Sequence, residues 1–416
     1  MNQSIWTSLL ACAGLLMTTA CTEVTSPSAA STAPQLFTLE PTPDRSTLQR
    51  TGNAYLKGLL ANPAYEQITL IKLAPALVSS QTQALSVTLP DGKSAQFKLR
   101  RVNSVAARDE GWVGQVPSQW KASHPASPDE IESDPFYYLS LVRNGSDLGG
   151  SLMVDGQLYY FEQIAPGQHV LIKVDESRMP PSAEPVRSSD NRQVQEVAGS
   201  AHAPPSVIRL LLVSSRQRRA QDPNYRTSME DAVQTANLFM ANSKVEVTYE
   251  IAGYLDADYD EEGRTYQQQL ADMKPGTTLG NAIAAERAAL NADLAAMYSY
   301  SASVCGVANL NATKDSAFSM IACRGALAHE LGHNLGAMHK WPEEAHWPVP
   351  EYAFGHRSES PVFHTVMVTS NGAIPYFSNP GLLYQGVPMG TPEHADVARR
   401  FDERRGIVEA FYPAVK

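Results

Sequence analysis

The sequence predicts an α/β fold in which a mainly-β N-terminal domain precedes a C-terminal domain built on a mixed, mostly parallel sheet. Residues 37–175 contain short alternating segments separated by Asp-Gly and Pro-Gly turns, the pattern of antiparallel strands. From residue 206 onward, strand-like and helix-like segments follow one another, which is typical of a sheet covered by helices. Residues 176–205 are rich in Pro and lack apolar periodicity, so we expect a linker there.

Composition excludes several classes of protein. The 416 residues are 43% hydrophobic, which is ample for a sizeable core. A net charge of −10 argues against a nucleic-acid partner, because such proteins usually carry a basic surface. No long apolar run follows the N-terminus, so a membrane partner is expected only through a lipid anchor.

The N-terminus has the features of an export signal over residues 1–21. Its apolar run, Ile5–Met17, is too short to span a membrane and ends at small residues before Cys21. Thr18-Thr-Ala-Cys21 resembles a lipoprotein-processing box, although Thr18 replaces the usual Leu and no basic residue precedes the run. We expect acylation of Cys21 and a place in the cell envelope, with simple cleavage near Ala20 and free secretion as the alternative. Residues 22–36 are small and polar, a flexible tether.

The N-terminal domain, residues 37–175, is expected to contain a series of hairpins. Ala84–Leu89 and Ala95–Leu99 alternate around Pro90-Asp-Gly92, a hairpin pattern. Further strands are predicted at Trp112–Val113, Tyr137–Val142, Ser151–Val154, Gln157–Phe161 and His169–Val174.

The C-terminal domain, residues 206–416, begins at Val207–Val213, a continuous apolar run typical of a buried strand. A helix capped by Thr227 or Ser228 with Asp231 should follow. The later elements are expected to be strands at Val245–Ile251 and Leu294–Tyr300 and helices at Asn281–Asn291, Ala322–Leu335 and Val397–Phe411.

Eleven residues within this domain carry a metal-binding pattern, His329-Glu-Leu-Gly-His333-Asn-Leu-Gly-Ala-Met-His339. On a helix, His329 and His333 lie on one face, at a separation that suits Zn²⁺. Gly336 permits a positive φ, so the chain can turn and bring His339 in as the third ligand. Glu330 lies to one side, where it reaches a metal-activated water as a general base. The alternative is an alanine-rich buried helix with incidental histidines.

Only two cysteines, Cys305 and Cys323, remain after the signal segment. In an exported protein, one pair eighteen positions apart predicts a disulfide. Closing a loop of that size stabilises a fold by about 3 kcal/mol in the chain-entropy model. Cysteine ligation of zinc is the alternative, but three histidines already fill that role.

The zinc motif resembles the metzincin endopeptidases, which also carry a Met-turn beneath the metal. Met367 is the candidate for that turn, and Tyr376-Phe-Ser-Asn-Pro380 follows it. This order is similar to bacterial reprolysin-type (adamalysin-like) proteases and their peptidyl-Asp metalloendopeptidase relatives, over roughly residues 206–416. The resemblance implies a metzincin-type catalytic domain with a zinc helix, one Zn²⁺ ion and protein or peptide substrates. Lys340 stands where reprolysin-type enzymes usually carry an Asp that helps anchor the turn, so that anchor is not expected here, whereas the ligand set is unchanged.

Residues 37–175 resemble reprolysin-type propeptides, and an unrelated β-sandwich domain is the alternative. A cysteine switch is excluded, because residues 22–304 contain no Cys. Latency would then need a carboxylate, a histidine or steric blockage, with Asp175 and His169 as candidates. Arg187 and Arg192 are candidate maturation sites in the linker. The sequence therefore predicts an exported zinc endopeptidase, and a catalytically silent surface lipoprotein on the same scaffold is the alternative function.

Overall fold

The computed structural model describes residues 33–106, 109–187, 204–300, 303–341 and 349–415. The signal segment, Cys21 and most of the tether therefore lie outside the described residues, as does Arg192. Residues from Ala33 onward form one compact unit. No helix within the described ranges is long and apolar enough to cross a membrane.

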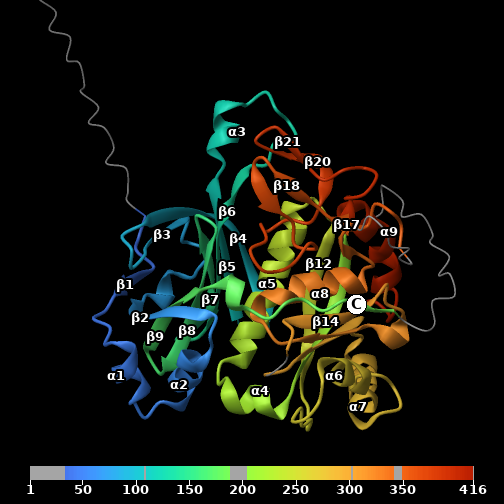
Figure 1. Cartoon of the computed structure of the whole chain (residues 1–416), viewed down its shortest axis with the longest axis horizontal. Coiled ribbons are helices and arrows are strands. Elements are labelled where there is room, and N and C mark those ends of the chain that lie inside the picture. Colours follow the sequence, from blue (N-terminus) through green and yellow to red (C-terminus); the bar gives the residue numbers. More distant parts are fainter. Residues whose placement is uncertain (1–32, 107–108, 188–203, 301–302, 342–348, 416) are drawn as a thin grey trace, which may run out of the picture. The chain divides into compact units, whose positions relative to one another are not determined.

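The N-terminal region is a nine-stranded sheet in the order β1-β2-β9-β8-β7-β6-β5-β4-β3, with every neighbouring pair antiparallel (Figure 1). Every strand predicted in this region is present. Two strands, β1 and β2, and three short helices were not predicted. The elements are β1 (Phe37–Leu39), α1 (Arg45–Gln49), α2 (Ala54–Ala61), β2 (Tyr65–Leu73), β3 (Ala84–Thr88), β4 (Ser94–Ala106), β5 (Asp109–Pro117), α3 (Gln119–Ser123), β6 (Ser133–Asn144), β7 (Asp147–Val154), β8 (Gln157–Ala165) and β9 (Gln168–Val174).

The C-terminal region is built on a six-stranded sheet in the order β10-β14-β15-β13-β11-β12. Only the β14–β15 pair is antiparallel, so the mixed, mostly parallel sheet is confirmed. Its elements are β10 (Val186–Arg187), β11 (Ser206–Ser214), α4 (Arg216–Gln221), α5 (Tyr225–Asn242), β12 (Val247–Asp256), α6 (Tyr266–Asp272), α7 (Thr278–Leu290), β13 (Leu294–Tyr298), β14 (Gly306–Leu310), β15 (Phe318–Ile321), α8 (Leu327–Asn334) and α9 (Val397–Glu409).

Beyond α8 the chain forms three small two-stranded sheets, β16–β17, β18–β19 and β20–β21. Their strands are β16 (Met338–Lys340), β17 (Phe354–Gly355), β18 (Arg357–Glu359), β19 (Val362–His364), β20 (Asn379–Tyr384) and β21 (Val387–Met389). The described residues also form four 3₁₀ turns, η1 (Pro75–Leu77), η2 (Glu176–Arg178), η3 (Lys314–Ser316) and η4 (Arg324–Ala326).

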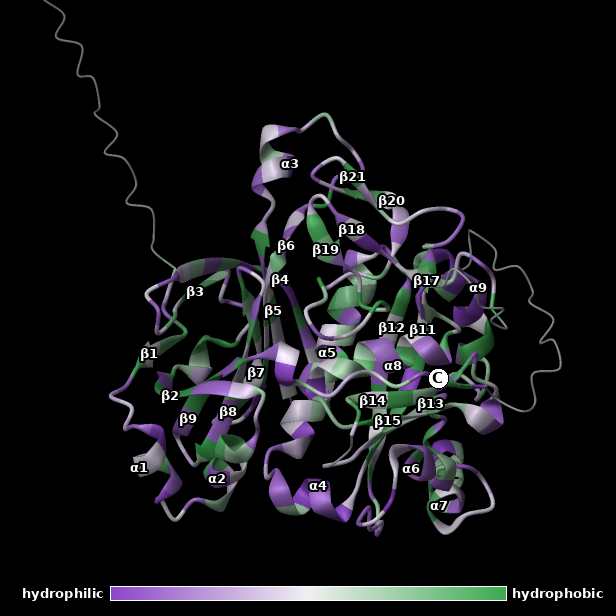
Figure 2. Ribbon diagram, viewed as in Figure 1, coloured by the Kyte–Doolittle hydropathy of each residue, from purple (hydrophilic) through white to green (hydrophobic). Residues whose placement is uncertain are grey.

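Helix α5 lies between the two sheets and joins their cores. Met229, Ala232 and Met240 pack with the C-terminal core, whereas Leu238 belongs to a cluster of the N-terminal sheet. Apolar residues follow the central strands, and the exposed helix α4 is strongly hydrophilic (Figure 2). The two regions therefore share buried surface along one helix.

Three details differ from the sequence-based predictions. Helix α5 begins at Tyr225, so Ser228 and Asp231 lie inside it and do not cap it; both are buried against other elements. Helix α8 begins at Leu327, after η4, and not at Ala322. The expected linker contributes β10, because its prolines are tolerated at a sheet edge where the missing N–H costs little.

Candidate metal centre

Helix α8 places His329 and His333 on its buried face, and the turn after it brings in His339. The three Nε2 atoms lie 3.0, 3.0 and 3.1 Å apart. A tetrahedral zinc ion with bonds of about 2.0–2.1 Å requires nitrogen atoms roughly 3.3 Å apart, so the three imidazoles fit such an ion. The structure thus brings together all three histidines that the sequence singles out.

The turn depends on Gly336, whose φ is +91°. A Cβ atom there would lie 2.8 Å from Arg400 Nε and 2.9 Å from Asn311 Oδ1. The last carbonyl groups of the helix are also satisfied, because Asn311 N–H donates to His333 O and Ala312 N–H donates to Asn334 O, both at 2.9 Å. Both backbone conformation and close packing therefore require glycine at this position.

Each histidine has a partner for its second ring nitrogen. Val366 O lies 2.8 Å from His329 Nδ1, and Ala337 O lies 2.8 Å from His333 Nδ1. These carbonyls accept from Nδ1–H and leave each Nε2 as the metal-binding atom. Burial lowers the pKa of His329 to about 3 and that of His333 well below its usual range, so both imidazoles are neutral, the form that binds a metal.

The residue after Val366 is the predicted Met-turn residue. Met367 is fully buried, and its Sδ would lie 2.5 Å from a Cβ atom added to Gly332 of α8. The methionine thus packs directly under the helix that carries the histidines.

Glu330 lies beneath β14, the strand next to β10. Burial raises the pKa of its carboxyl group well above the usual range. Neither carboxylate oxygen has a hydrogen-bond partner among the residues that the structure describes. An orphaned buried carboxylate is costly unless a bound group or water satisfies it, so Glu330 marks a place for one. Gly306 of β14 leaves room for this side chain, since a Cβ atom there would lie 2.5 Å from Glu330 Oε1.

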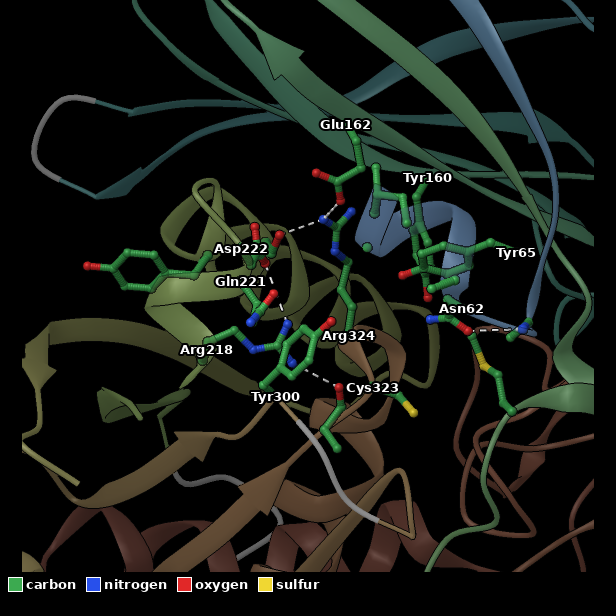
Figure 3. A pocket seen from close by; sticks show the side chains of 18 of the residues that line it. Asn62, Tyr65, Tyr160, Glu162, Arg218, Gln221, Asp222, Tyr300, Cys323 and Arg324 are labelled. Carbon is green, nitrogen blue, oxygen red and sulfur yellow. Dashed lines mark hydrogen bonds and ion pairs between the residues drawn. The ribbon is translucent and has the colours of Figure 1, made fainter. Parts of the chain in front are cut away.

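The start of the histidine helix is anchored on both sides. Cys305, just before β14, forms a disulfide with Cys323, as expected from the sequence. The next residue, Arg324, has a largely buried side chain that pairs with Glu162 of β8; Ser228 of α5 accepts from it at 2.6 Å. The pair borders a cavity of about 380 Å³ between the two regions (Figure 3).

Sequence reasoning missed three residues at this centre. Gly306 and Arg324 stand beside the predicted cysteines, but only their three-dimensional neighbours make them important. The third is Glu184, in the expected linker, whose Oε1 lies 3.1 Å from His339 Nδ1. The run of prolines around Glu184 was the only available signal, and it was interpreted as a linker.

A family model described as metallo-peptidase family M12B, reprolysin-like, matches residues 226–340. The chain is 28% identical over 406 residues to a peptidyl-Asp metalloendopeptidase of Stenotrophomonas maltophilia, covering 92% of this chain and 95% of that protein. It is 27% identical to a protein of the same name from Xanthomonas campestris, with the same coverage. Metalloproteinase-II from Bacteroides fragilis matches at a TM-score of 0.37 and 11% identity, over 70% of this chain and 86% of that one, too distant to carry an argument.

Proposed function

We propose that this chain, a reprolysin-like metalloendopeptidase, hydrolyses internal peptide bonds of proteins with one zinc ion held by His329, His333 and His339 and with Glu330 as the proton carrier. One observation supports this above the others. Three imidazole nitrogens converge beside a buried carboxylate that has no protein partner among the described residues. Three ligands with a free fourth position are typical of catalytic zinc.

The role of Glu330 follows from its position. A zinc ion on three imidazoles makes water nucleophilic near pH 7 and polarises a carbonyl oxygen. Glu330 would accept a proton from the attacking water as the new C–O bond forms. It then delivers that proton to the amine nitrogen as the C–N bond breaks, so the carboxylate is regenerated.

The test compares Glu330→Gln with wild type and with Glu250→Gln, an exposed glutamate paired with Arg209. We expect Glu330→Gln to lower kcat/KM by about 100-fold or more, the usual contribution of a general base, with the zinc content unchanged. Glu250→Gln should behave as wild type. Removal of the metal by a chelator should abolish hydrolysis, and one equivalent of Zn²⁺ should restore it.

An unchanged rate in Glu330→Gln would overturn this mechanism. Failure to hydrolyse any member of a peptide library, with zinc bound and after proteolytic cleavage within residues 176–205, would favour the alternative of a silent surface protein on this scaffold. Peptides containing Asp are the first set to test, because the relatives are named for that residue. The control is the same peptides with Asp replaced by Asn, which tests whether the substrate carboxylate is required.

We further propose that the protein is exported and acylated at Cys21. The support is the sequence alone: a short apolar run followed by small residues and cysteine. Mass spectrometry of the N-terminal peptide should show a lipid on Cys21, and Cys21→Ser should release the protein from the membrane fraction. A mature N-terminus without lipid would instead support free secretion.

A further inference from the structure

We infer that residues 176–187 occupy the substrate-binding edge of the metalloprotease site and that the Glu184 carboxylate fixes the orientation of His339. Occupation of this edge makes the intact chain latent without a cysteine. The inference rests on the proposed function, since it assumes that the histidine cluster is the catalytic centre. It assigns to the expected linker a specific binding position on β14.

Strand β14 is the sheet strand that lies against Glu330, so an extended peptide bound along it would pass the candidate catalytic groups. Apart from β10, it has β15 as its only neighbour in the six-stranded sheet, so without residues 180–187 its outer side would be an edge. Sheet edges bind extended peptides through their free N–H and C=O groups. Gly306, the first residue of β14, lies directly over Glu330, so a peptide on this edge lies beside the proposed base.

The segment already binds that edge through its backbone. Cys305 N–H donates to Pro181 O at 2.9 Å, and Ala183 N–H donates to Gly306 O at 3.2 Å. Farther along, Val186 and Arg187 pair in parallel with Asn309 and Leu310. The prolines at 180, 181 and 185 restrict the segment to extended conformations, which lowers the entropy lost on docking.

The loop after Met367 holds the same segment from another direction. Gly372 N–H donates to the carboxylate of Glu176 at 2.8 Å, and Asn371 Nδ2–H donates to Pro180 O at 3.2 Å. Residues 176–187 therefore connect this loop to β14. Where β10 pairs with β14, the edge of β14 is no longer free to bind another chain.

Glu184 supplies the hydrogen-bond partner for Nδ1 of the third histidine. His329 and His333 have backbone carbonyl partners, but His339 Nδ1 meets the Glu184 carboxylate, 155 positions earlier in the chain. A carboxylate behind a metal-binding histidine fixes its orientation and increases its basicity. Glu184 brings this carboxylate from the segment that precedes the catalytic region in the sequence.

Asp175 and His169, the two candidates considered from the sequence, lie elsewhere. Asp175 caps η2 by accepting from Ser177 N–H, and His169 is buried in β9 beside Ile71 of β2. Of the options considered from the sequence, the structure favours steric occupation of the β14 edge together with the carboxylate of Glu184.

The metal test uses the full chain loaded with Co²⁺, whose visible spectrum reports ligand geometry, and measures affinity by competition with a chelator. Glu184→Ala should weaken binding by about tenfold or more, the usual effect of losing such a partner, and should alter the spectrum. Glu184→Gln, which keeps an accepting oxygen, should recover part of the affinity. Glu66→Gln, which removes an exposed partner of Lys173, is the control. Equal affinity of Glu184→Ala and wild type would overturn the role of Glu184.

The occupancy test measures binding of a peptide hydroxamate to the zinc-loaded full chain. Ala183→Pro removes the N–H that donates to Gly306, whereas Ala183→Gly keeps it. Hydroxamate should bind Ala183→Pro at least tenfold more tightly than wild type, with Ala183→Gly close to wild type. Hydroxamate binding to wild type as tight as to Ala183→Pro would overturn the occupancy. Should Ala183→Pro fail to fold, Asn371→Ala, which removes the donor to Pro180 O, loosens the same segment without removing a partner of the histidines.

Neither measurement requires turnover, so the two ideas fail separately. If Glu330→Gln leaves the rate of hydrolysis unchanged and the binding data are as expected, only the proposed mechanism is rejected. Hydrolysis that depends on Glu330, together with hydroxamate binding that the segment does not impede, would reject the latency alone.

Discussion

The chemistry of single residues at the centre depends on glycines as much as on the ligands. Gly306, Gly332 and Gly336 each stand where a Cβ atom would meet a functional neighbour: Glu330, Met367 or Arg400. The spacing of the three histidines and Gly336 can be predicted from the sequence, because all four lie within two turns of one helix and the bend after it. Gly306 could not, because its partner is 24 positions away.

At this scale we predict that Gly306→Ala impairs catalysis without removing the metal. The added Cβ atom would lie 2.5 Å from Glu330 Oε1 and 2.7 Å from its Cγ, so the carboxylate must move. We expect kcat to fall by about tenfold or more, since proton transfer depends on position. Gly406→Ala, an open position in α9, is the control. Wild-type kcat in Gly306→Ala would contradict this account.

At the scale of elements, the mostly parallel sheet and the histidine helix follow from local patterns, but the strand order and the element ends do not. The predicted helix from Ala322 fails at its first turns because Cys323 is tied to Cys305 and Arg324 turns toward Glu162. Strand β10 also escaped prediction, since two residues carry no periodicity. Contacts with other elements decided both boundaries.

One such contact joins strand β13 to the last turn of the chain through Asp293, just before β13. Its carboxylate accepts from Arg209 N–H at 2.9 Å and from Tyr412 N–H at 3.3 Å. Burial outweighs these bonds and raises the pKa of Asp293 to about 6. An unfolded Asp titrates near about 3.9, so the folded state binds the proton more tightly. The stability from this group is full below about pH 4 and is lost as the pH rises through about 6.

The comparison with Asp293→Asn isolates this effect. We expect the free energy of unfolding of wild type, relative to the variant, to decrease between pH 4 and pH 7, as measured by urea unfolding at several pH values. A difference that stays constant over this range would show that Asp293 does not titrate as proposed.

On the scale of the whole molecule, a buried polar network joins the two sheets. Arg324 pairs with Glu162 of the N-terminal sheet and approaches Asp231 of α5 at 3.9 Å. Ser140 of β6 donates to Asp231 at 2.6 Å. The N-terminal sheet is thus attached to the start of the histidine helix, so its docking and the geometry of the metal centre are coupled.

We predict that Arg324→Ala destabilises the intact chain by about 3–5 kcal/mol, because two buried carboxylates lose their cation. Hydrogen exchange should increase in β8 and α5. Arg216→Ala, which breaks an exposed pair with Asp258, should leave the free energy of unfolding nearly unchanged. Similar unfolding curves for the two variants would show that the network does not hold the sheets together.

The sequence by itself predicted the candidate metal ligands, the candidate base, the cysteine pair and about half of the strands and helices, because each depends on residue type and short spacing. Only the tertiary structure decided which residues surround these candidate site residues. Glu184 behind His339, Gly306 over Glu330 and Arg324 beside Glu162 join positions from 24 to 162 apart. Such pairs form only when strands and helices stack, and no local pattern in the chain encodes which distant side chain will fill a given space.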